Sequence, residues 1–154
     1  MRERAVNLSV TTPFVIVAQV DEVAHLRAED ETGAFGILPG HADFLTALSV
    51  SVVSWREKNG REHHVAVRGG VLEVQGGKTI LIATQEAIAD DDLHRLETDV
   101  LVTFRRRVEE ERVARIDAQR LYLEAMRQIY RFLNPGRAPI SGLGQSTLDE
   151  GLDQ

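Results

Sequence analysis

The feature that most constrains this chain is an abrupt change in residue usage near residue 89. Gly and Pro punctuate the first 88 residues, whereas neither occurs between residues 90 and 134. Short runs of Val, Ile and Leu between turn residues are typical of β-sandwiches and barrels. A long stretch of Arg, Glu, Leu, Ala and Gln is typical of helix. The sequence therefore predicts a β part followed by a helical part.

The β part contains seven apolar runs. Two of the intervening turns are explicit, because Asn59-Gly60 and Gly76-Gly77 suit type I′ hairpins, in which both central residues need positive φ. Aromatic residues make up only 5% of the chain, with Trp55 the single Trp, so the core must be aliphatic. We expect an N-terminal β-sandwich, or flattened barrel, with strands at residues 6–10, 14–20, 35–38, 45–55, 62–67, 71–74 and 79–83.

The helical part has clear ends but no clear turn. Asp90–Asp92 can cap its start, and Asn134-Pro135-Gly136 stops it. Between the two predicted apolar stripes lies the charged block Arg105–Arg112, whose three i,i+4 Arg–Glu pairs indicate a solvated helical face. Because no Gly or Pro marks a bend, the segment can form either a hairpin or an extended arm. The predicted stripes are Leu93, Leu96, Val100, Phe104 and Val108, then Ile116, Leu123, Met126, Tyr130 and Leu133.

These patterns divide the chain into three parts. We expect a β-sandwich domain at residues 1–88 and a helical domain at residues 89–136. From residue 137 to 154, Gly, Ser, Pro and Asp prevail, which predicts a disordered tail.

Composition excludes several classes of function. Cys is absent, which excludes disulfide scaffolds and thiolate metal sites. The net charge is −6, and acidic side chains outnumber basic ones in both the β part and the helical part, so we expect no nucleic-acid partner. No apolar run approaches the ~20 residues of a spanning helix, and the N-terminus does not resemble a signal peptide. We expect a soluble protein without direct membrane insertion.

The sequence contains no pattern typical of a catalytic or metal site. His63 and His64 are neighbours in a predicted strand, so they point to opposite faces and cannot chelate one metal ion. His25 and His94 are isolated, and a small enzyme with a cupin-like pocket would need clustered His and Glu. We therefore expect no catalytic residue, no metal and no cofactor, and a part that binds or couples rather than an enzyme.

Two motifs carry a resemblance to a known family. Residues 33–48 read Gly-Ala-Phe-Gly-Ile-Leu-Pro-Gly-His-Ala-Asp-Phe-Leu-Thr-Ala-Leu, and residues 65–74 read Val-Ala-Val-Arg-Gly-Gly-Val-Leu-Glu-Val. Both are similar to hallmarks of the epsilon subunit of F-type rotary ATP synthases, they fall at the expected separation, and the β-then-helical order agrees. The resemblance covers residues 5 to about 134.

The resemblance implies a function and partners. It implies a non-catalytic subunit of the rotor's central stalk, which couples ion translocation through the membrane ring to ATP synthesis or hydrolysis. Its partners would be the gamma subunit and the rotor ring. The C-terminal helices would reach the catalytic alpha and beta subunits and could inhibit hydrolysis. The location would be peripheral, at the cytoplasmic face of the bacterial inner membrane. The alternative is a β-sandwich adaptor or scaffold with a helical self-association arm.

The resemblance also implies site residues. Ala34 stands where the family often has an acidic residue, so a ring contact made by that carboxylate would be missing. A weak candidate for ATP binding is Ile116-Asp117 with Arg120, which resembles a nucleotide-binding pattern of some bacterial members but lies farther along the helices. The rotor-interface candidates are Gly33, Ala34, Phe35, Pro39, Gly40 and His41. The regulatory helix candidates are Arg105, Arg106, Arg107, Arg120 and Arg127.

Overall fold

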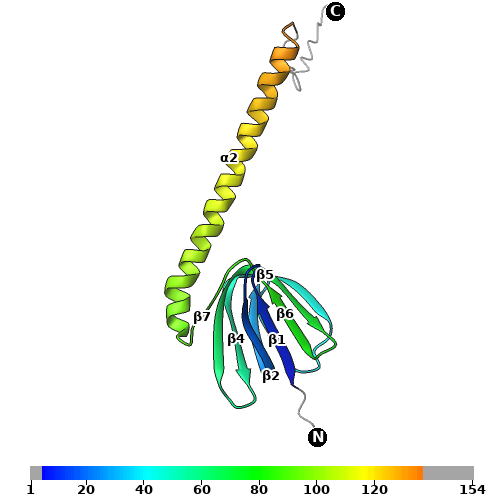
Figure 1. The fold of residues 1–154 in the computed structure, drawn as a ribbon, viewed down its shortest axis with the longest axis vertical. Helices are drawn as coiled ribbons and strands as arrows, with labels where there is room; N and C mark the ends of the chain where they lie inside the picture. The colour runs from blue at the N-terminus through cyan, green and yellow to red at the C-terminus, as the bar shows by residue number, and fades with distance from the viewer. Residues whose placement is uncertain (1–4, 137–154) are drawn as a thin grey trace, which may run out of the picture. The chain divides into compact units, whose positions relative to one another are not determined.

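A computed structural model describes residues 5–136, and the predicted tail at residues 137–154 lies outside the described residues. Seven strands precede the helical segment in this range (Figure 1). The strands are β1 (Val6–Thr11), β2 (Ile16–Asp30), β3 (Gly33–Ile37), β4 (Phe44–Glu57), β5 (Glu62–Gln75), β6 (Thr79–Ala83) and β7 (Ala87–Ala89). The helical elements are α1 (Leu93–Arg95), a π-helical turn η1 (Leu96–Val100) and α2 (Leu101–Leu133).

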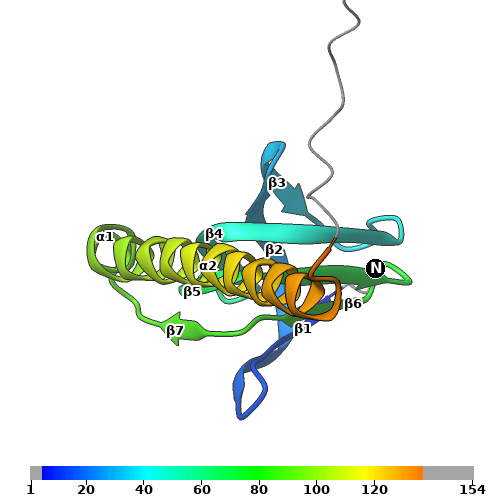
Figure 2. The same cartoon turned by 90° about the horizontal axis from the view of Figure 1, so that it is seen from above.

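Five strands close into a ring, which confirms the predicted flattened barrel. The strand order is β1-β6-β5-β4-β2, and β1 also pairs with β2. All these pairings are antiparallel except that of β1 with β6. The short strands β3 and β7 add to β2 and β5 at the margins of the barrel (Figure 2).

The core of the barrel is aliphatic, as the composition predicts. Leu8, Leu26, Leu72 and Ile80 are fully buried, and Trp55 is the only large aromatic side chain buried among the strands of the described residues. Buried and exposed positions alternate along β1 and β6, because successive side chains of a strand point to opposite faces. The alternation leaves one face of each strand available for contacts outside the core.

One predicted turn type is confirmed and the other is wrong. Gly76 and Gly77 have φ of 59° and 64°, and the Lys78 amide donates to the Gln75 carbonyl, as in a type I′ turn, with Lys78 as a third loop residue because Gln75 pairs with Thr79. At Asn59-Gly60 the turn starts one residue earlier than predicted, so that Lys58 and Asn59 are its central residues. The Gly60 amide donates to the Glu57 carbonyl, and the Glu57 amide donates to the Arg61 carbonyl. The Asn59 side chain stabilises this turn with two hydrogen bonds. Its Oδ1 accepts one from the Arg61 amide, and its Nδ2 donates one to Glu57 Oε2.

The strand boundaries also differ from the prediction in three main places. The run predicted at residues 14–20 belongs to a longer strand, β2, which begins at Ile16 and continues to Asp30. The runs at 62–67 and 71–74 form one strand, β5, because β4 pairs with it on both sides of Gly69 and Gly70. The strand β7 was not predicted, because its three residues are too few to show a period. It extends the β part to Ala89.

The helical segment buries a different set of side chains from the predicted first stripe. Leu96, Leu101 and Phe104 are buried against Ala66, Val50 and Val52, whereas Leu93 and Val108 are exposed. The spacing of five between Leu96 and Leu101 does not fit an α-helix, but it fits the i→i+5 hydrogen bonds of η1. The π turn therefore replaces Val100 with Leu101 in the buried row.

The chain divides into two compact units, Met1–Val113 and Ala114–Gln154. The first unit contains the barrel together with the segment from Leu93 to Val113. Residues 114–133 of the second unit belong to the same helix, α2, so residues 101–133 form one continuous helix and not a helical hairpin. No helix within residues 5–136 is both long and apolar enough to cross a membrane.

Phe104 is the largest fully buried side chain in the described residues, and it connects the helix to the barrel. We expect Phe104→Ala to lower the free energy of unfolding by about 3 kcal/mol, through lost burial and the cavity left behind. Urea unfolding of the full chain measures this change. Phe132→Ala is the matched control, because Phe132 is 86% exposed and should be close to neutral. Equal effects of the two substitutions would contradict the packing.

Candidate functional site

The rotor-interface candidates lie on one continuous segment, residues 33–41, which we call the rotor loop. Its first half is the strand β3, which pairs with β2 from Gly33 to Ile37. Ala34 is exposed on this strand, so the position that lacks the family's carboxylate faces solvent. Phe35 is half-buried, and its ring meets the Phe44 ring edge-on at 5.5 Å between centroids. The first half of the loop is thus anchored by an aromatic contact.

The second half of the rotor loop is a tight turn from Leu38 to His41. The His41 amide donates to the Leu38 carbonyl at 3.1 Å, and Gly40 has φ of 84°. Pro at the second position and positive φ at the third define a type II turn. His41 Nδ1 donates to the Ala42 carbonyl at 2.7 Å, and its ring lies 5.7 Å from that of Phe44. The Phe44 ring thus contacts a side chain from each half of the rotor loop.

The turn is braced against the Gly76–Gly77 hairpin. The Gly40 amide donates to the Gly77 carbonyl at 2.9 Å, and the Gly76 amide donates to Asp43 Oδ1 at 2.7 Å. The two backbones are so close that a Cβ on Gly77 would stand 2.7 Å from Gly40 Cα. Two glycine turns far apart in sequence therefore form one rigid edge of the barrel.

The start of the rotor loop is held by Asp30. Its Oδ1 accepts hydrogen bonds from the amide and the hydroxyl of Thr32, and its Oδ2 accepts one from the Thr46 hydroxyl at 2.8 Å. The Thr32 hydroxyl, followed by that of Thr46, lowers the pKa of Asp30. A lowered pKa in the folded state means that this contribution to stability is present near neutral pH. It is lost as the pH falls through the lowered value.

An apolar face adjoins the rotor loop on the outside of the barrel. Leu45 is 67% exposed because it faces outward from β4. Ala47 pairs with Val71, and Val71 pairs with Ala83, so these side chains form a row across three strands. The Pro13 loop borders a pocket of about 450 Å³ beside this row. We call this surface the apolar sheet face: Leu45, Ala47, Val71, Leu81 and Ala83, with the charged Glu73 between Leu45 and Leu81.

The β1–β2 connection extends this exposed apolar surface. Phe14 is 94% exposed, and Val15 and Ile16 are more than half exposed. Contiguous apolar surface on a soluble chain marks a site of contact with another molecule. The rotor loop and the apolar sheet face are thus two surfaces of the barrel that stay exposed and can contact another molecule.

The chain is similar to known proteins over most of its length. Residues 5–90 match the family described as ATP synthase, Delta/Epsilon chain, beta-sandwich domain. "ATP synthase epsilon chain 2" of Paraburkholderia xenovorans is 39% identical over 131 residues, which are 85% of this chain and 94% of that protein. The protein of the same name from Cereibacter sphaeroides is 39% identical over 141 residues, which are 90% and 96% of the two chains.

This chain belongs to the ATP synthase delta/epsilon chain family. Membership confirms the resemblance seen in the two motifs and makes the chain a subunit of an ATP synthase. The fold agrees with that of a chain in the Euglena gracilis mitochondrial ATP synthase. That chain is 20% identical with a TM-score of 0.55, and the match covers 73% of this chain and 66% of that one.

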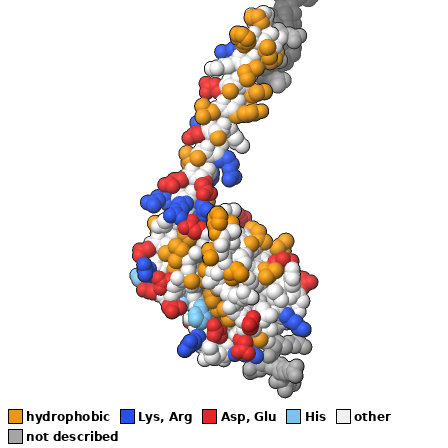
Figure 3. Space-filling view, viewed as in Figure 1, with side chains coloured by type: hydrophobic (Ala, Val, Ile, Leu, Met, Phe, Trp, Pro, Cys, Tyr) orange, Lys and Arg blue, Asp and Glu red, His pale blue; other side chains and the backbone are white. Residues whose placement is uncertain are grey.

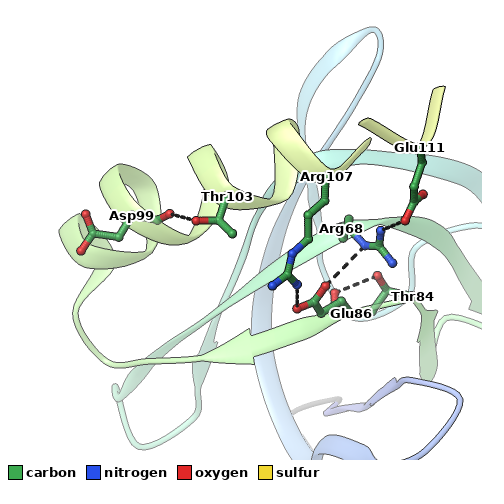
Figure 4. A network of polar contacts seen from close by, with 7 residues as sticks. All are labelled: Arg68, Thr84, Glu86, Asp99, Thr103, Arg107 and Glu111. Carbon is green, nitrogen blue, oxygen red and sulfur yellow. Dashed lines mark hydrogen bonds and ion pairs between the residues drawn. The ribbon is translucent and has the colours of Figure 1, made fainter. Parts of the chain in front are cut away.

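The charged block of the helix is only partly the solvated face that its spacing predicts. Arg106 pairs with Glu110 at 3.8 Å, as expected for i,i+4 neighbours. The predicted Arg107–Glu111 pair is absent, because both side chains contact the barrel instead. Arg107 binds Glu86, and Glu111 binds Arg68 (Figure 4). Sequence reasoning missed Arg68 and Glu86, although Arg68 stands inside the second hallmark motif.

The remaining helix candidates lie on exposed turns. Arg105 borders a pocket of about 440 Å³ together with Arg27 and Glu97. Arg120 and Arg127 are exposed in the second unit. Ile116 and Asp117, which with Arg120 form the ATP candidate, occupy the same exposed helix. A ligand pocket is concave and one exposed helical turn is convex, so the helix alone offers little enclosure. These residues stay a weak candidate for ATP binding, without support from this geometry.

Gly76 and Gly77 provide a matched test of the braced edge. Both have positive φ, but a Cβ on Gly76 meets nothing within 4 Å, whereas one on Gly77 meets the Gly40 backbone. We expect Gly76→Ala to cost about 1 kcal/mol of stability through backbone strain, and Gly77→Ala to cost at least twice as much. Urea denaturation measures both variants. Equal costs would mean that the rotor loop is not held against this turn.

Proposed function

We propose that this chain is the epsilon subunit of the central stalk of an F-type ATP synthase. In this role it couples ion translocation through the membrane ring to ATP synthesis or hydrolysis and has no active site of its own. The observation that carries the proposal is the extent of similarity to epsilon chains. The aligned 131 and 141 residues are longer than the matched β domain, so they include helical residues as well.

Two surfaces of the barrel suit the two proposed rotor partners. The apolar sheet face provides apolar surface that a partner can cover and remove from water. We propose that the gamma subunit is this partner. The braced rotor loop presents Pro39, Gly40 and His41 at one rigid edge, which suits contact with the membrane ring. Ala34 in place of a carboxylate makes this contact depend on shape and apolar area rather than on charge.

The helical arm suits a reversible contact with the catalytic subunits. Tyr122, Ile129 and Phe132 are all more than half exposed on α2. Figure 3 shows hydrophobic side chains at the surface along this helix. An amphipathic helix that leaves its apolar side chains exposed is suited to lie in a groove of another protein. We propose that the arm meets the catalytic alpha and beta subunits and inhibits hydrolysis. The chain would then be peripheral, at the cytoplasmic face of the bacterial inner membrane.

Assembly tests the function directly. A tagged chain should capture gamma and ring subunits when it is purified from native membranes that have been solubilised with detergent. Leu45→Asp should reduce gamma recovery at least tenfold, because it places a charge in the apolar sheet face. Val102→Asp is the matched control, since Val102 is 57% exposed on the first turn of α2 and outside that face. Recovery of self-associated chain alone would favour the adaptor alternative and contradict the stalk function.

Inhibition by the arm is a separate prediction. A chain that ends at Val113 keeps the whole first compact unit and loses the exposed apolar helix. If the arm inhibits, complexes assembled with this shortened chain should hydrolyse ATP several-fold faster than complexes with the full chain. Gamma recovery should stay unchanged, which separates lost inhibition from lost assembly. Equal hydrolysis rates in fully assembled complexes would contradict the inhibitory role.

A further inference from the structure

The helical segment contacts the barrel through two layers of different chemistry. The first layer is the apolar cluster of Leu96, Leu101 and Phe104 on Ala66, described above. The second layer follows one helical turn later and is made only of charged side chains (Figure 4). Beyond it, the described residues of α2 are exposed from Arg112 to Leu133.

The charged layer is a chain of four alternating side chains. Arg107 forms an ion pair with Glu86. Glu86 also lies beside Arg68, with 3.6 Å between Glu86 Oε2 and Arg68 Nε, and Arg68 forms a second ion pair with Glu111. The barrel supplies Arg68 and Glu86, and the helix supplies Arg107 and Glu111 one turn apart. The hydrogen bond that Arg107 donates to Glu86 raises the pKa of Arg107.

Burial within this layer is uneven. The Arg68 side chain is 14% exposed, and its Nε has no hydrogen-bond partner within the described structure, whereas Glu111 is 60% exposed. Removing the carboxylate of Glu86 would therefore leave a nearly buried charge with only the exposed Glu111 as its partner. Losing one partner of a buried charge destabilises a structure more than losing an exposed pair. Glu86 is accordingly the residue on which the layer depends most.

We propose that Arg68, Glu86, Arg107 and Glu111 form a clasp that fixes α2 on the barrel up to Glu111. Movement of the arm then starts beyond the clasp and not at the linker around residues 89–92. The π turn contributes to this arrangement, since it rotates the helix so that Leu101 and Phe104 face the barrel. Arg107 and Glu111, which come one and two turns after Phe104, then face the barrel as well. The clasp lies outside the function proposed above, and the isolated chain suffices to test it.

Distances between spin labels can locate the pivot. The chain has no Cys, so two labels can be introduced without background. One pair joins Glu31→Cys, in the exposed β2–β3 turn, to His94→Cys in α1. The second pair joins Glu31→Cys to Arg115→Cys, just beyond the clasp. We expect narrow distance distributions for both pairs in the otherwise unchanged chain.

Variants of the clasp test whether it holds α2 on the barrel. Glu86→Gln should at least double the width of the 31–115 distribution and leave the 31–94 distribution unchanged. Arg107→Gln should act in the same direction, and because it alters a half-exposed side chain it should not unfold the barrel. Arg106→Gln is the matched control, because it removes the same charge from the same helix but breaks only the intrahelical pair with Glu110. It should leave both distributions unchanged.

Three results would overturn the proposal. Narrow distributions for both pairs in Glu86→Gln and Arg107→Gln would mean that the clasp does not hold the helix. A broad 31–94 distribution in any of these chains would place the pivot at the linker. An equal broadening by Arg106→Gln would mean that total helix charge, and not the clasp, sets the position of the arm.

Discussion

The double pairing of β1 is the constraint on which the rest of the structure depends. This strand pairs in parallel with β6 and antiparallel with β2, and it thereby closes five strands into a ring. Closure removes the free edges of these strands, which would otherwise invite pairing with another chain. It also gives each strand an inner and an outer side. The inner sides form the aliphatic core, and every surface discussed above lies on an outer side or at an end of the ring.

The outer side of the barrel is divided between the chain itself and its proposed partners. Ala66, Val50 and Val52 are covered by the helical segment, whereas Leu45 and Val71 lie farther along the same strands and stay exposed. Strands β4 and β5 are 14 residues long, so they reach past the area that the helix covers. The same two strands thus anchor the helical segment at one part and contribute to the apolar sheet face at another.

The helical segment shows how a change of chemistry along one helix can separate a fixed part from a free part. Apolar contacts hold residues 96–104, charged contacts reach residue 111, and the following residues are exposed. Apolar burial is largely insensitive to salt, whereas pairs of partly exposed charges are screened by it. The boundary between the held and the exposed residues therefore lies where the contact with the barrel is most easily altered.

The sequence by itself determined the order of the parts, the aliphatic core, the Gly76–Gly77 turn and the family, because each depends on local spacing or on a contiguous motif. Tertiary structure alone decided the rest. The Asn59-Gly60 turn depends on side-chain hydrogen bonds, and the π turn depends on how Leu96 and Leu101 pack together on Ala66. Arg107 and Glu111 could each pair with an opposite charge on the helix or with one on the barrel. The barrel placed Glu86 and Arg68 within reach, and a partly buried counter-ion is a stronger partner than a solvated neighbour on the same helix.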